Sequence, residues 1–297
     1  MFKGSLTALI TPFKAGKVDE AAYERLIEWQ ITEGTHGLVP VGTTGESPTL
    51  NHEEHKEVVA LCVRVAKGRV PVIAGAGSNS TAEAIDFTRH AKKVGADAVL
   101  HATGYYNKPT QEGIYQHFKA ISDAVAMPIF IYNVPPRTVI DIAVATLARC
   151  AKLANVVGIK DASANVGRVT QQRLACGADF VQLSGEDATA LGFMAHGGAG
   201  CISVTSNVAP RLCAQFQNAC LAADWVKARA LHERLMPLHD ALFCESNPGP
   251  VKYAASALGL CSGELRLPLV AIAEESERKV DAALRAVGLS RLAQAAV

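Results

Sequence analysis

Short runs of apolar and β-branched residues recur along the first two-thirds of the chain, and stretches with apolar residues at helical spacing separate them. Runs of the first kind predict buried strands, and a repeat of three to four residues predicts amphipathic helices. We expect eight strands, at residues 6–10, 37–41, 71–74, 97–100, 128–132, 155–161, 180–183 and 200–203. Asp19 and Asn51 stand where helix N-caps are expected.

Eight strands that alternate with helices predict an α/β fold of the (β/α)8 TIM-barrel type. The competing doubly wound sheet carries a Gly-x-Gly-x-x-Gly turn after its first strand. This sequence has no such turn there, and Gly75-Ala76-Gly77 after the third strand is too short a match. We therefore predict the barrel.

The strand pattern stops near residue 223, and helical patterns follow. Apolar residues repeat at helical spacing at Val226, Ala230, Leu231, Leu235 and Leu238. Residues 251–260 and 280–292 are also interpreted as helical. We expect a catalytic barrel at 1–223 and a C-terminal helical domain at 224–297. Because catalysis in such barrels takes place at the strand carboxyl ends, we expect the extension to serve packing and subunit contact.

The composition narrows the classes of function. Of the 297 residues, 49% are hydrophobic and the formal net charge is +1. No bulk field therefore favours nucleic acid or anionic lipid. The N-terminus lacks the apolar core of a signal peptide, and no stretch reaches the roughly 18 apolar residues of a membrane-spanning helix. We expect a cytoplasmic protein that binds neither nucleic acid nor membrane.

Eight cysteines are scattered along the chain without a Cys-x-x-Cys pair. We interpret them as reduced residues of the core, with a disulfide or metal role as the alternative. No Cys/His/Asp cluster with the spacing of metal ligands accompanies the strand ends, so we expect no metal.

The strand at 155–161 carries one lysine, Lys160, near its carboxyl end. Burial disfavours the ammonium form of a lysine, and a neutral amine can condense with a carbonyl. The alternative is a lysine whose ammonium reaches solvent past the strand end.

Other polar side chains follow neighbouring strands and should meet Lys160 at one barrel mouth. The turn at 42–45 can direct N–H groups and two hydroxyls at a carboxylate, or it can be an ordinary turn. Tyr132 can move protons as an acid or base, or it can cap the barrel. Arg137 can bind a carboxylate with two N–H groups, or it can form a surface ion pair.

Three motifs carry a resemblance to a known family: Gly42-Thr43-Thr44-Gly45-Glu46, Tyr132-Asn133-Val134-Pro135-x-Arg137-Thr138 and Gly158-Ile159-Lys160. The chain resembles the dihydrodipicolinate synthase family, within the pyruvate-dependent class I aldolases, over nearly its whole length. The resemblance implies a lyase of the diaminopimelate route to lysine, which condenses pyruvate with L-aspartate 4-semialdehyde.

The resemblance also implies roles for the motif residues. Lys160 forms a Schiff base with pyruvate, and Tyr132 relays protons. Thr44 lies in that relay between Tyr132 and Tyr106, and Tyr106 comes from a neighbouring subunit of a homotetramer, a dimer of dimers. No external cofactor is implied, since the lysine itself activates the substrate.

The remaining implied roles concern substrate binding. Thr43 and Thr44 hold the pyruvate carboxylate, and Arg137 receives the carboxylate of the semialdehyde. Gly185 and Ile202 contribute main-chain carbonyls near the site.

The family also has a feedback site for L-lysine at a subunit interface. The matching positions are Ser47, Leu50, His52, His55, Asn79, Glu83 and Tyr105. His52 and His55 share a helix face, and Glu83 can pair with a ligand ammonium. A metal site and two solvent-facing histidines are the alternatives. Pro48 and Gly104 depart from the family pattern, which has a small residue and a proline there, so we expect an altered pocket wall and a more mobile loop around Tyr106.

Two other functions remain open from the residues alone. One keeps the Schiff base but changes the aldehyde, as in N-acetylneuraminate lyase or a 2-keto-3-deoxy sugar acid aldolase. The other is a barrel that binds a small carboxylate without chemistry, which requires Lys160 to stay protonated.

Overall fold

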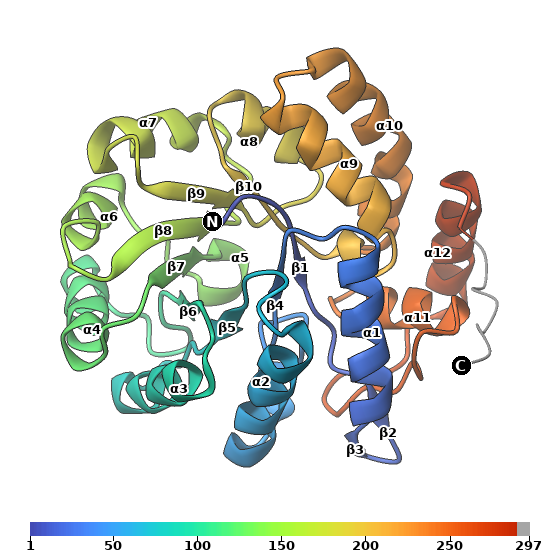
Figure 1. Cartoon of the computed structure of the whole chain (residues 1–297), viewed down its shortest axis with the longest axis horizontal. Coiled ribbons are helices and arrows are strands. Elements are labelled where there is room, and N and C mark those ends of the chain that lie inside the picture. The colour runs from blue at the N-terminus through green and yellow to red at the C-terminus, as the bar shows by residue number, and fades with distance from the viewer. Residues whose placement is uncertain (290–297) are drawn as a thin grey trace.

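The structure, a computed structural model, describes residues 1–289 and contains a barrel of eight parallel strands (Figure 1). The strands are β1 (Gly4–Ala8), β4 (Gly37–Val39), β5 (Ile73–Gly75), β6 (Ala98–Ala102), β7 (Ile129–Asn133), β8 (Val156–Asp161), β9 (Val181–Ser184) and β10 (Gly200–Ser203). Their order is β4-β1-β10-β9-β8-β7-β6-β5. A bridge between Leu38 and Val72 links the two ends of this order. The predicted strands are confirmed, each to within two residues.

Helices follow the strands and surround the barrel (Figure 1). They are α1 (Glu20–Thr32), α2 (His52–Ala66), α3 (Thr81–Val94), α4 (Gln111–Ala124), α5 (Pro135–Thr138), α6 (Val144–Cys150), α7 (Gly167–Cys176), α8 (Ala190–Ala195) and α9 (Pro210–Leu221). Asn51 caps α2 as predicted, because its side chain accepts from the Glu54 N–H and the Glu54 carboxylate accepts from the Asn51 N–H. This reciprocal pair stabilises the first turn of the helix.

A two-stranded antiparallel hairpin, β2 (Phe13–Lys14) and β3 (Lys17–Val18), lies between β1 and α1. The sequence did not predict it, because two residues per strand are too few to show a periodicity.

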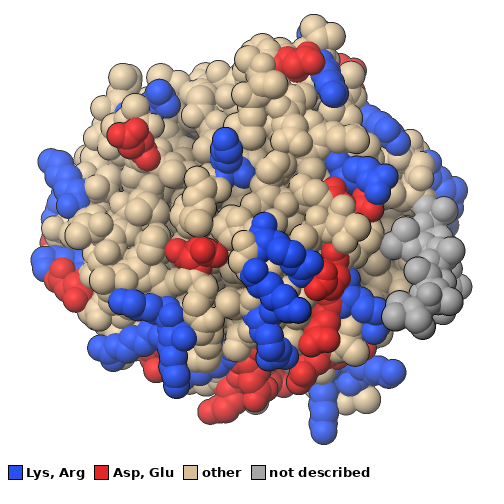
Figure 2. All heavy atoms as spheres, viewed as in Figure 1, with Lys and Arg blue, Asp and Glu red and all other residues tan. Residues whose placement is uncertain are grey.

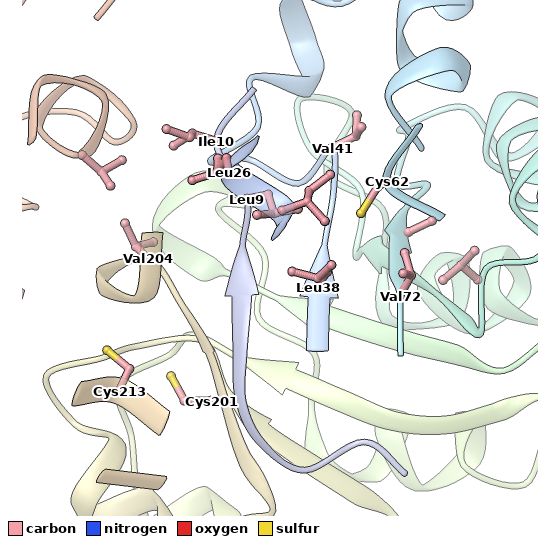
Figure 3. Close-up of a cluster of buried hydrophobic side chains, with 14 of the residues drawn as sticks. Leu9, Ile10, Leu26, Leu38, Val41, Cys62, Val72, Cys201, Val204 and Cys213 are labelled. Atoms are coloured by element: carbon pink, nitrogen blue, oxygen red, sulfur yellow. The ribbon is translucent and has the colours of Figure 1, made fainter. Parts of the chain in front are cut away.

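The strands are buried on both faces, which explains their near-continuous apolar sequences. One cluster fills the barrel interior and contains Leu6, Ala8, Val39, Ile73, Ala98, Leu100, Phe130, Leu183 and Ile202. A second cluster lies between the strands and the helices, where Leu38 of β4 and Cys62 of α2 take part (Figure 3). Gly158 of β8 has no room for a side chain, since a Cβ would lie 2.4 Å from the Val181 carbonyl oxygen and 2.5 Å from the Phe130 ring. The glycine therefore lets β8 approach its neighbours.

The C-terminal part is helical as predicted and comprises α10 (Trp225–Ala241), α11 (Gly249–Ala257) and α12 (Glu274–Ala286). The predicted apolar face of α10 is partly wrong: Val226 and Ala230 are exposed, and Ala228 is buried with Leu235 and Leu238. The helix predicted at 280–292 begins earlier and ends at Ala286, while residues 290–292 lie outside the described residues.

Charged side chains of both signs are interspersed on the face shown in Figure 2, in keeping with a net charge of +1. Within residues 1–289, none of the helices combines the length and the apolar character that crossing a bilayer requires. All eight cysteines belong to this range, and each is a free thiol. Five are buried, but Cys176 and Cys261 are only partly buried and Cys244 is exposed, so the prediction of a core position is wrong for Cys244.

Candidate active site

Strand pairing places Lys160 beside Tyr132. Residue 160 of β8 is directly opposite residue 132 of β7 in the parallel register. The Lys160 Nζ lies 4.3 Å from the centroid of the Tyr132 ring, and Lys160 is only 7% exposed. The predicted lysine is therefore held inside the barrel mouth against an aromatic face rather than extended into solvent. An amine next to a phenol is suited to reactions that need a nucleophile and a nearby proton carrier.

The residue that follows β9, Gly185, packs against the same lysine. A Cβ on Gly185 would lie 3.0 Å from the Lys160 Cε and 2.8 Å from the Ala162 Cβ. Next in the chain, Glu186 has its pKa raised, mainly by burial and then by the neighbouring Asp187 carboxylate. The Lys160 charge opposes this shift. Glu186 is thus a buried carboxyl group close enough to Lys160 to be affected by its charge.

A cavity of about 230 Å³ opens at these strand ends. It brings together Thr43, Tyr105, Tyr132 and Arg137, which come from four different segments. Lys160 and Thr44 do not form its wall in the described structure; they are buried next to residues that do. Hydroxyl, phenol and guanidinium groups around one small cavity are the donors that a carboxylate-bearing substrate requires.

Asn247 joins two of the predicted site residues and was not anticipated from the sequence. Its Nδ2 donates to Thr44 Oγ1 at 3.0 Å, and its main-chain oxygen accepts from Arg137 Nη2 at 3.4 Å. It lies in the segment between α10 and α11, so the C-terminal helical part contributes to the site as well as to packing. The cluster Asn247-Pro248-Gly249-Pro250 marks a turn in the sequence, but that signal does not indicate what the turn contacts.

A buried ion pair holds the turn that carries Thr43 and Thr44. Lys252 of α11 places its Nζ 2.5 Å from Glu46 Oε1, and both side chains are completely buried. Glu46 also accepts from the main-chain N–H of Arg266 at 3.2 Å. Burial lowers the pKa of Lys252, and the Glu46 carboxylate opposes that shift.

Two predicted site residues, Ile202 and Tyr106, do not line the cavity at the strand ends. Ile202 is buried in the barrel interior, and Tyr132 packs against the same cluster. Tyr106 is 91% exposed in this single chain. Gly104, two residues before it, has a φ of +87°. Proline, which fixes φ near −65°, cannot adopt that conformation, so this backbone conformation requires a residue other than proline at position 104.

A second cavity, of about 190 Å³, contains most of the predicted effector residues. Its walls include Ser47, Leu50, His52, His55, Glu83 and Tyr105. Asn79 is adjacent, since its Nδ2 donates to the Tyr105 carbonyl at 3.3 Å. Ser47, Pro48, Gly77 and Tyr105 line both cavities. The two cavities therefore share a wall, and Pro48 is part of it.

The two histidines of this second cavity differ in their surroundings. The His52 Nε2 lies 2.7 Å from a Glu83 carboxylate oxygen. His55 stacks on Phe87 with ring centroids 3.9 Å apart, and burial lowers the pKa of His55 to about 4. The alternative of two solvent-facing histidines is therefore wrong for His55. Among residues 1–289 no group of three or more His, Cys, Asp or Glu side chains is arranged to hold a metal ion.

Together these features define a (β/α)8-barrel protein whose site is organised around a buried lysine at the carboxyl end of one strand. Residues 1–287 match the model of the Dihydrodipicolinate synthetase family. The chain belongs to this family, as the sequence motifs predicted.

Individual relatives agree with this assignment. The chain is 67% identical over 289 residues to the 4-hydroxy-tetrahydrodipicolinate synthase of Parvibaculum lavamentivorans, covering 97% of this chain and 99% of the relative. Its fold is similar to the crystal structure of dihydrodipicolinate synthase from Aquifex aeolicus, with a TM-score of 0.96, 45% identity, and coverage of 98% and 100%. It is also similar to that of the enzyme from Cyanidioschyzon merolae with lysine bound, with a TM-score of 0.94, 38% identity, and coverage of 97% and 99%.

Proposed function

We infer that this protein catalyses the 4-hydroxy-tetrahydrodipicolinate synthase reaction, in which pyruvate condenses with L-aspartate 4-semialdehyde. The observation that carries the inference is the Lys160 amine, which is held over the Tyr132 ring in a chain 67% identical to a synthase of that name. The reaction is the lyase chemistry of lysine and diaminopimelate biosynthesis.

The proposed chemistry begins with the neutral Lys160 amine. Its Nζ attacks the C2 carbonyl of pyruvate, and water leaves to give an imine. Loss of a proton from C3 converts the imine into an enamine, which attacks the aldehyde carbon of the second substrate. The amine of that substrate then adds to the imine carbon, closes the ring and displaces Lys160. No further cofactor is proposed, because the imine itself withdraws electrons from C3.

Other predicted site residues take the supporting roles in this proposal. Tyr132 and Thr44 carry protons during imine formation, and Tyr106 completes that relay from a neighbouring subunit. Thr43 and Thr44 bind the pyruvate carboxylate, while Arg137 binds the carboxylate of the semialdehyde. The bidentate geometry of a guanidinium suits that task. We assign substrate-facing carbonyls to Gly185, next to Lys160, and to Ile202.

The wider setting of the enzyme is also a proposal. We propose that L-lysine binds the second cavity, where Glu83 can meet an ammonium, and that the active form is a homotetramer. The exposure of Tyr106 supports a partner subunit at that loop. Residues 1–223 are assigned to the catalytic barrel and 224–297 to the C-terminal domain. The free thiols fit a reducing compartment, and we place the protein in the cytoplasm.

Borohydride reduction in the presence of pyruvate tests this function. We expect mass spectrometry to find one reduced pyruvyl adduct, on Lys160, and none when pyruvate is omitted. Lys160→Ala should give no adduct, whereas Lys56→Ala, which removes a lysine of a surface ion pair with Asp86, should behave like the parent protein. Absence of the adduct, or an adduct on another lysine, would refute the proposal.

A further inference from the structure

Asn247 makes two contacts that reach far along the chain. Its side chain contacts Thr44, 203 residues earlier, and its main-chain oxygen contacts Arg137, 110 residues earlier. Asn247 is only 6% exposed. One residue of the C-terminal part thus holds two residues that the proposed function assigns to different substrates.

The direction of the hydrogen bond to Thr44 determines whether the Thr44 hydroxyl can still donate its own hydrogen. A hydroxyl has one hydrogen to donate and two lone pairs that accept. Because the Asn247 amide donates to Oγ1, it occupies a lone pair and leaves the Thr44 hydrogen available for another acceptor. A carboxylate in the same place would instead take that hydrogen.

The surroundings of the amide favour this orientation. The Asn247 Oδ1 is buried without a hydrogen-bond partner in the described structure. If the amide were flipped, Oδ1 would face Thr44, and both N–H donors of Nδ2 would lose this hydrogen bond. The unpartnered group would then be an N–H donor pair instead of one carbonyl oxygen. Buried donors without partners are rarer and more costly than under-used carbonyls, so the donor belongs on Thr44.

We propose that Asn247 is a positioning residue that fixes the polarity of the proton relay. Its amide donates to Thr44 so that the Thr44 hydroxyl donates in turn toward Tyr132 and the reacting imine. This inference rests on the proposed function, in which Thr44 is part of the relay. Asn247 touches no reacting atom in this scheme and acts through Thr44, and its main-chain carbonyl orients Arg137.

Two substitutions at Asn247 separate the effect of hydrogen-bond direction from the effect of side-chain shape. Asn247→Ala removes the donor, and the rate of pyruvate imine formation should fall about tenfold. Asn247→Asp preserves the shape but reverses the bond, so the rate should fall further, on the order of 100-fold. The KM for the semialdehyde should change less than threefold in both, because the main-chain carbonyl that contacts Arg137 remains. Rapid-quench borohydride trapping measures the rate, and steady-state assays give KM.

The controls distinguish this inference from the proposed function. Asn218→Asp changes an exposed asparagine whose side chain hydrogen-bonds to His36, and it should react like the parent. If the parent itself forms no adduct on Lys160, the proposed function fails. If the parent is trapped normally and Asn247→Asp reacts as fast as Asn247→Ala or faster, the polarity inference is overturned.

A double-mutant cycle covers the case in which Asn247→Asp does not fold. Asn247→Ala should slow imine formation in the parent but have almost no further effect in a Thr44→Ala background, since both changes then remove the same interaction. Additive losses would show that Asn247 does not act through Thr44 and would equally overturn the inference. Thermal unfolding of each variant identifies any that are not folded.

Discussion

At the scale of single residues, the position of the Lys160 side chain depends on one glycine, Gly185. Gly185 follows β9 and leaves room for the Lys160 methylene chain, which a Cβ would approach to 3.0 Å. The same Cβ would lie 2.8 Å from the Ala162 Cβ, which real structures do not tolerate without movement. The position of the reactive amine is therefore set from the neighbouring strand as well as from β8.

Gly185→Ala should accordingly impair the chemistry more than the fold. The added methyl group pushes the Lys160 side chain away from Tyr132, and small misplacements of a reacting group lower rates by up to about 100-fold. We expect the rate of pyruvate imine formation to fall at least tenfold by borohydride trapping. Gly192→Ala is the matched control, because its nearest contact would be an ordinary 3.5 Å to Val166. Equal rates in the two variants would contradict this account.

At the scale of elements, the sequence was informative where the signal is local. Apolar runs located all eight barrel strands, and Asn51 located the start of α2 as an N-cap. The contacts that organise the site are not local: Asn247 meets Thr44 across 203 residues and Lys252 meets Glu46 across 206. No periodicity or spacing in a single sequence encodes such pairs. The C-terminal helices were therefore predicted, but their contribution to the site was not.

The ion pair between Lys252 and Glu46 connects α11 to the Thr43–Thr44 turn, and its contribution to the free energy of unfolding can be measured. Lys252→Met leaves the Glu46 carboxylate buried without its partner, which costs about 3–5 kcal/mol for fully buried pairs. We expect urea unfolding to show a loss of this size. Replacing both residues, Lys252→Met with Glu46→Gln, should recover much of it, because no charge is then left unpaired.

The control for this prediction is a lysine of an exposed pair. Lys279→Met removes a partner of Glu275 on the surface of α12, and it should change the free energy of unfolding little. The structural account of the buried pair is wrong if Lys252→Met is as mild as Lys279→Met, or if the double replacement is as damaging as Lys252→Met alone.

At the scale of the whole molecule, the barrel contains several histidines that are neutral in the fold. Burial lowers the pKa of His101 to about 3 and the pKa values of His55 and His117 to about 4. In the unfolded chain a histidine titrates near 6.5. As the pH falls from about 6.5 to about 4, the unfolded chain therefore binds protons that the folded protein does not.

The free energy of unfolding should consequently decrease as the pH falls through this window, and these groups should contribute nothing above about pH 7.5, where they are neutral in both states. His101→Gln isolates one of them, since glutamine does not titrate and can still hydrogen-bond to Thr88, the partner of His101 Nε2 at 3.0 Å. Its loss of stability between pH 6 and pH 4 should be smaller than that of the parent by up to about 1.4 kcal/mol per pH unit. Urea unfolding at several pH values measures both slopes, and His196→Gln, at an exposed position, should retain the parental slope. Parallel curves for His101→Gln and the parent would mean that His101 binds its proton equally in both states, contrary to its complete burial between β6 and α3.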